Sequence, residues 1–392
     1  MFKKVYSSFI LFIAIFGPKF GIFDTRLFLA FFIYLLYPGD LKNLPKTIVF
    51  LFICLFFLTG YSLLVYIFNE SDYVDSLRYL RCIFGTFLVV HLFKNFDFKL
   101  IFNTLIFVLL LHIISIYTSV LFPQSQAFFA YISGYNKDFR PFRVSGLVAG
   151  FDIAGILSLI TSYLLYELVN IEKKKIFYIL FFLSYFSVFF TSRTNSLYAI
   201  LLAFYFFYKF MKGFKLKPTF IFSLLTFSFS FIFILYRFVL PILIDSWNLD
   251  IAIEFAERPD IYESGYSKNN PLEILESLII IPNNFIGLIF GTSFDPPDSD
   301  SGYIKSLNII GLFGLCFYFL TFFTIYFSLT NKKVYETESI KYFKKIFKFI
   351  LFTTFIASIK NQYFFTRGVF ELFVITLLLL QIKINQKQFV KC

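Results

Sequence analysis

The 392-residue chain is 58% hydrophobic and 23% aromatic, with a mean hydropathy of +0.77. A soluble protein of this length does not carry so much apolar surface, so the composition excludes a soluble globular domain and indicates a membrane protein. The net charge of +12 would indicate nucleic-acid binding in a soluble protein, but here basic loops that set membrane orientation explain it. We therefore expect no nucleic-acid partner.

Apolar runs near the length of a membrane span recur along the whole chain. They predict an all-α polytopic integral membrane protein with about 12 transmembrane helices, in which residues 1–392 form a single membrane domain. Lys3 and Lys4 precede the first run, but no small-residue cleavage site follows it, which favours an uncleaved first span. The predicted spans are 5–22, 24–37, 47–68, 73–93, 99–122, 145–169, 176–190, 195–210, 218–244, 303–329, 346–359 and 364–382.

Lysine and arginine are distributed differently among the predicted loops. With the N- and C-termini placed in the cytoplasm, the inner segments carry 22 lysines and no arginine, which satisfies the positive-inside rule. The rule does not explain why every arginine lies elsewhere. The planar guanidinium fork grips phosphate and carboxylate groups bidentately, which indicates an outward-facing anion site; snorkelling to lipid phosphates is the plain alternative. The nine arginines are Arg26, Arg78, Arg81, Arg140, Arg143, Arg193, Arg237, Arg258 and Arg367.

The fourth predicted span carries charge within its apolar run. In "DYVDSLRYLRCIF", Asp75, Arg78 and Arg81 follow one another at intervals of three and share one helix face. Arg78 and Arg81 would lie about 8 Å and about 12 Å below the helix start. Charges at that depth face a bundle interior or a wet cavity, so both a binding site and a structural Asp–Arg pair explain them.

Two predicted outer loops stand out. The loop 123–145 ends in "NKDFRPFRVSG", which places Arg140 and Arg143 close together. The following span contains "GLVAGFDIAG", whose three glycines favour close helix approach. Asp152 is expected about two turns into that span, as an ion-pair partner or a site residue.

The second outer loop, 245–302, is large enough to carry interfacial helices. "SWNLDIAIEFAERPD" predicts an amphipathic surface helix that ends at Arg258. A later apolar stretch is interrupted by "PNN" at 282–284, which favours a surface-lying or re-entrant helix. The "DSD" that ends at Asp300 is similar to a metal-binding pattern, but in "PPDSDSG" a solvated turn explains it better. We expect neither a metal nor another cofactor, because nucleotide and zinc motifs are also missing from the sequence.

Three segments in order resemble the O-antigen and capsular polysaccharide polymerase family (Wzy type), which is related to the O-antigen ligases. They are "TSRTNSLY" around Arg193, "ERPDIY" with Arg258, and "DSDSGYIKSLNIIGLFG" with Asp300, within roughly residues 140–330. The resemblance implies a metal- and nucleotide-independent glycosyltransferase at the outer face of the bacterial inner (cytoplasmic) membrane. It would transfer a growing glycan from undecaprenyl diphosphate to a new lipid-linked repeat unit. Its partners would be the undecaprenyl-diphosphate-linked oligosaccharide, membrane lipids and a chain-length regulator protein.

The resemblance also assigns roles to residues. Outer-loop arginines of the family bind the diphosphate, and preorganised guanidinium groups would stabilise the charge of the leaving group. Asp300 matches the acid before the family's Gly-Tyr pair and is the favoured general base, with Asp295 and Glu263 as open alternatives. Two spaced arginine–glycine patterns of some polymerases do not occur intact, so the donor and acceptor loops stay unassigned. The expected catalytic residues are Asp300, Arg193 and Arg258, and the expected substrate-binding residues are Arg143, Arg193, Arg258, Arg140, Arg78, Arg81 and Tyr303.

Two other functions remain open. An O-antigen ligase would move the finished glycan to another acceptor, and the absence of an outer-loop histidine argues against it, because His91 and His112 fall within predicted spans. A flippase or transporter of lipid-linked oligosaccharide would also need a cationic cavity, but it would be expected to show two repeated halves. No such repeat is evident in the sequence.

Overall fold

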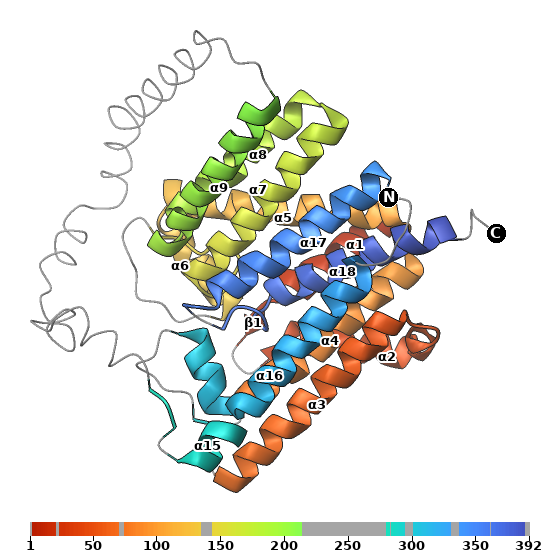
Figure 1. Ribbon diagram of the computed structural model, residues 1–392. Coiled ribbons are helices and arrows are strands. Elements are labelled where there is room, and N and C mark those ends of the chain that lie inside the picture. Colours follow the sequence, from red (N-terminus) through yellow and green to blue (C-terminus); the bar gives the residue numbers. More distant parts are fainter. Residues whose placement is uncertain are drawn as a thin grey trace, which may run out of the picture. The chain divides into compact units, whose positions relative to one another are not determined.

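The computed structural model describes residues 2–20, 23–69, 74–134, 143–213, 280–282, 284–294, 301–330, 337–360 and 362–388. These residues are almost entirely helical, and their one pair of strands is a short antiparallel contact between β1 (Lys19–Phe20) and β2 (Phe23–Asp24). The chain divides into two compact units (Figure 1). The first unit comprises residues 1–109 and 268–392, and the second comprises residues 110–267.

Each unit has its own set of described helices, with α5 shared between them. The first unit contains α1 (Phe2–Phe16), α2 (Thr25–Leu36), the short 3-10 helix η1 (Pro38–Leu41), α3 (Lys46–Asn69), α4 (Val74–Asn95), the first half of α5 (Phe98–Leu121), α15 (Phe285–Phe290), α16 (Gly302–Thr330), α17 (Glu338–Ala357) and α18 (Val369–Gln388). The second contains the rest of α5, α6 (Ser125–Ser133), α7 (Phe151–Glu172), α8 (Lys175–Ser187), η2 (Val188–Phe190) and α9 (Arg193–Gly213).

Five of the described helices are long and apolar enough to cross a membrane: α3, α4, α5, α7 and α16. Shorter apolar helices include α2, α8 with η2, and α9. Eleven of the twelve predicted spans coincide with a helix to within several residues, and the range 218–244 lies outside the described residues. The helical, membrane-compatible class is thereby confirmed, while the total of twelve spans and the orientation stay predictions.

In the first unit, α4 is the central helix. It packs against α1, α2, α3 and α18 (Figure 1). Its residues from Phe87 to Leu92 are all buried, including His91, as expected of a helix surrounded on every side. Near its other end, α4 carries Arg81, which lies beside Asp24 at the start of α2.

In the second unit, α7 is the buried helix, and it packs against α8, η2 and α9. It begins at Phe151, six residues later than predicted, because Gly146 and Gly150 have φ angles of 53° and 125° that interrupt a helix. Asp152 consequently lies in the first turn of α7, and its predicted position two turns into the span is wrong.

Two glycines of this segment, Gly146 and Gly155, allow the close approach to a helix that was predicted. A Cβ atom on Gly155 would collide with the side chains of Thr191 and Asn195, at the turn before α9 and in its first turn. A Cβ atom on Gly146 would collide with Ser115 of α5, although Gly146 precedes α7 and has a positive φ. Gly150 acts only through its positive φ, so the sequence pattern was correct for the first and third glycines.

A second pair of glycines shapes α16. Gly311 interrupts the helix with φ 65° and ψ −178°, and Gly291, which follows α15, has φ 89°. The two glycines cross closely: a Cβ atom on either would collide with the backbone of the other segment. Thr292 N donates to Asn308 O at 2.6 Å, so a carbonyl released by the break in α16 is paired again. Broken helices are tolerated at membrane depth when such backbone groups are satisfied within the protein.

We expect Gly311→Ala to destabilise the protein by about 1–3 kcal/mol, because alanine is strained at this φ and its Cβ would meet the backbone at Ile289. The measurement is the thermal unfolding midpoint of the purified protein in detergent. Gly60→Ala is the control, since a Cβ at Gly60 in α3 meets nothing within 4 Å. Equal midpoints for the two variants would contradict this account of the helix break.

Candidate functional site

Five ionisable side chains meet where α2, α4 and α18 converge in the first unit. Asp24 and Arg26 come from the start of α2, and Arg81 lies about two turns into α4. Arg367 and Glu371 flank the start of α18. We refer to these five residues as the arginine cluster.

The base of the arginine cluster is a buried ion pair. Arg26 Nη1 donates to Glu371 Oε1, and both side chains are almost fully buried. Glu371 Oε2 also accepts from Gly368 N at 2.7 Å. Gly85 of α4 makes room for this carboxylate, because a Cβ atom there would collide with it. The pair thus has the additional hydrogen bond and close packing that a buried pair needs in order to be stable.

Asp24 joins the other two arginines to this base. Its Oδ1 accepts from Arg26 N at 3.0 Å and caps α2, while its Oδ2 accepts from Arg367 Nη2 at 3.0 Å. Arg81 Nε lies 3.6 Å from the same Oδ2, and Arg367 Nη1 donates to Gly17 O. The side chains of Arg81 and Arg367 are 32% and 18% exposed, so they form the accessible edge of the cluster.

The arginine cluster carries more positive than negative charge. Three guanidinium groups face two carboxylates, and Arg78 lies one turn earlier on α4. An excess charge among apolar helices is costly unless water or a counter-ion reaches it. An anion that contacts Arg81 and Arg367 would supply that counter-charge through charge-assisted hydrogen bonds.

Lysines occupy the opposite ends of the same helices. Lys94 lies in the last turn of α4 and donates to Lys42 O at 2.8 Å, and Lys383 Nζ lies 4.1 Å from the ring centroid of Phe98. Arg81 and Arg367, in contrast, lie near the other ends of α4 and α18. The segregation of lysine from arginine in the sequence therefore corresponds to opposite ends of these helices.

Three of the predicted site residues are described in the first unit. Arg81 lies beside Asp24 rather than beside a described acid of its own helix, and the side chain of Asp75 is outside the described set. Tyr303 donates from its hydroxyl to Phe355 O at 2.6 Å, which ties the start of α16 to α17. Arg78 is in the same helix as Arg81, so these two predicted residues both lie at the arginine cluster. Tyr303 instead makes a contact that packs two helices together.

The second unit brings together two other predicted positions. Val144 N donates to Phe190 O at 2.8 Å, which holds the segment with Arg143 beside the turn that precedes Arg193. Arg193 is the first residue of α9, and Asn195 Nδ2 in the same turn donates to Asp152 O at 2.8 Å. Both arginines therefore lie at the end of the second unit where α7 and α9 begin. Several other predicted residues lie outside the described part of the chain: Arg140, Arg258, Glu263, Asp295 and Asp300. The side chain of Arg193 is likewise not described.

The ring nitrogens of both histidines contact polar atoms within the protein. His91 Nδ1 lies 2.5 Å from Asp40 Oδ2 at the lysine end of α4, where Tyr6 contacts the other ring nitrogen at 3.4 Å. His112 Nε2 lies 3.4 Å from Ala154 O in the second unit. Both histidines are buried within helical bundles, which agrees with a structural role.

Four members of the arginine cluster are not among the predicted site residues: Asp24, Arg26, Arg367 and Glu371. Glu371 carried a usable signal, because an acid inside the predicted span 364–382 is costly without a partner. Its partner, Arg26, is 345 residues away in the chain, and no local pattern connects the two.

The sequence matches no protein-family model and no curated protein, and the structure matches no solved structure. The described features that bear on function are the arginine cluster and the contact between the segments of Arg143 and Arg193.

We expect Glu371→Leu to destabilise the protein by roughly 3–5 kcal/mol, because it leaves the Arg26 guanidinium buried without its counter-charge. The double variant Arg26→Met/Glu371→Leu replaces both charges with apolar side chains and should recover most of that loss. Thermal unfolding of the four proteins in one detergent measures the cycle. Additive losses in the double variant would show that the two side chains are not coupled.

Proposed function

We propose that the protein is a polymerase that joins undecaprenyl-diphosphate-linked oligosaccharide repeat units into O-antigen or capsular polysaccharide. It would work as a multi-pass protein of the bacterial inner membrane, with about twelve spans and both termini in the cytoplasm. The proposal rests on the resemblance of residues 140–330 to the Wzy-type family, in particular on the segments around Arg193, Arg258 and Asp300.

One structural observation carries the proposal furthest. The hydrogen bond from Val144 N to Phe190 O holds two segments together although they are 46 residues apart in the chain. Each segment leads into an arginine that the resemblance assigns to the diphosphate, Arg143 on one side and Arg193 on the other. Two arginines in neighbouring segments of the chain would suit the two phosphates of a polyprenyl diphosphate.

The arginine cluster of the first unit adds support of a different kind. Its exposed edge is made of Arg81 and Arg367, and its excess positive charge favours an anion. Lysine would satisfy a charge requirement equally well, so the consistent use of arginine favours a ligand with planar, bidentate acceptor groups. Phosphate oxygens provide that geometry.

The proposed reaction assigns a task to each type of residue. The bond between the donor's anomeric carbon and its diphosphate oxygen breaks, and a bond from the acceptor hydroxyl oxygen to that carbon forms. Arginines would stabilise the negative charge on the departing undecaprenyl diphosphate, a contribution of several kcal/mol in preorganised sites. The hydroxyl proton would pass to a carboxylate, with Asp300 favoured over Asp295 and Glu263.

We expect Arg193→Lys and Arg193→Ala each to reduce the surface glycan to single repeat units, because lysine keeps the charge but loses the bidentate fork. The measurement is the glycan ladder on a gel from a host that lacks the gene, complemented at matched membrane levels. Lys174→Ala is the control: this exposed lysine, at the opposite end of α8, pairs with Glu172 at 2.6 Å and should leave the ladder unchanged.

Other outcomes separate the alternatives. A full ladder from both Arg193 variants would reduce this residue to a membrane anchor. If the wild-type gene changes glycan attachment but not repeat number, the ligase function replaces the polymerase. If lipid-linked units accumulate inside the cell when the gene is absent, a transporter of lipid-linked oligosaccharide replaces the polymerase as the proposed function.

A further inference from the structure

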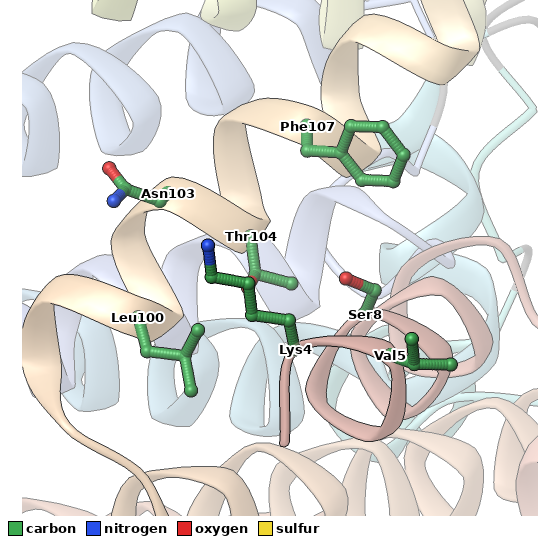
Figure 2. Close-up of a pocket in the computed structure, with 7 residues that line it drawn as sticks. All are labelled: Lys4, Val5, Ser8, Leu100, Asn103, Thr104 and Phe107. Carbon is green, nitrogen blue, oxygen red and sulfur yellow. The ribbon is translucent and has the colours of Figure 1, made fainter. Parts of the chain in front are cut away.

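A groove of about 460 Å³ lies between α1 and α5 at the lysine end of the first unit (Figure 2). Lys4, Val5 and Ser8 line it from α1, and Leu100, Asn103, Thr104 and Phe107 line it from α5. It lies at the opposite end of the helices from the arginine cluster and shares no residue with it. Its volume falls in the range of small-molecule and lipid sites.

The polar side chains of the groove are all able to donate hydrogen bonds. Lys4 offers an ammonium group, Ser8 a hydroxyl and Asn103 an amide, and no acid lines the groove. Within the described part of the chain, none of these three side chains has a hydrogen-bond or ion-pair partner. A ligand with several acceptor oxygens and a negative charge would complement them.

The amide of Asn103 in particular needs a hydrogen-bond acceptor. It lies five residues into α5, about 8 Å from the helix start, in a helix apolar enough to cross a membrane. An amide exposed to hydrocarbon at that depth is unfavourable unless an acceptor reaches it. No such acceptor is found for the Asn103 side chain among the described residues.

Apart from Thr104, whose hydroxyl lies 3.4 Å from Ser7 Oγ, the remaining walls of the groove are apolar. Val5 and Phe107 are exposed, with Phe107 at 52%, and Leu100 is half-buried. Figure 2 shows Phe107 on the next turns of α5 beyond Asn103, so an apolar surface continues from the polar part of the groove. An occupant must therefore combine an anionic polar head with a hydrocarbon chain.

We propose that this groove binds an anionic phospholipid. The phosphate oxygens would accept from Lys4 and Asn103, the head-group or ester oxygens from Ser8, and an acyl chain would lie along Phe107 and Val5. The lysine end is the end expected at the cytoplasmic leaflet, which is the leaflet where anionic lipids attract basic residues. This proposal does not depend on the glycan chemistry proposed above.

The test is native mass spectrometry of the purified protein with added phosphatidylglycerol, compared with phosphatidylcholine of the same chain length. We expect Lys4→Gln/Asn103→Leu to lower the retained phosphatidylglycerol by about tenfold, which corresponds to the loss of one charge-assisted contact. Lys3→Gln is the matched control, because Lys3 is the adjacent exposed lysine and does not line the groove. It should retain the lipid like the wild type.

Further arms separate this site from simpler explanations. Glycerol 1-phosphate, which has the head group without the chains, should not be retained; equal retention would show a free-anion site and overturn the lipid proposal. An equal loss in Lys3→Gln would show diffuse attraction to basic residues and would also overturn it. Retention in Lys4→Gln/Asn103→Leu at the wild-type level would overturn it directly, provided that size-exclusion profiles show both variants folded.

Discussion

Buried charge must be paired inside an apolar helical bundle, and in the first unit the pair of Arg26 and Glu371 meets this requirement. The pair connects the start of α2 to the start of α18, and α4 provides the space for it at Gly85. Asp24 then extends the network from the cap of α2 to Arg367 and Arg81. The ends of three helices are therefore positioned by one connected set of ion pairs.

This network separates the arginines into two roles. Arg26 lies at the buried base and is committed to Glu371, whereas Arg81 and Arg367 lie at the edge with part of each guanidinium exposed. A rigid base with partly accessible arginines above it is the arrangement that preorganised anion binding requires, because the side chains lose little freedom when the anion arrives. The lysines at the opposite helix ends need no such framework, since orientation depends on charge alone.

The proposed polymerase would handle two lipid-linked diphosphates, one on the growing glycan and one on the incoming unit. Each unit of the chain has its own arginine group, with Arg143 and Arg193 in the second unit and the arginine cluster in the first. Two separate groups would suit two anionic substrates. The crossing of Gly291 and Gly311 fixes where α16, the helix that follows Asp300 in the chain, is interrupted.

The sequence by itself determined the helical membrane class, eleven of the helix ranges and the separation of lysine from arginine, because apolar run length and charge composition are local properties. Only the tertiary structure decided which charges pair: Glu371 with Arg26, and Asp24 with Arg81 and Arg367, all distant in the chain. It also decided where α7 begins and where α16 breaks. Those positions depend on glycine φ angles and on backbone groups from other segments, which no local hydrophobic pattern records.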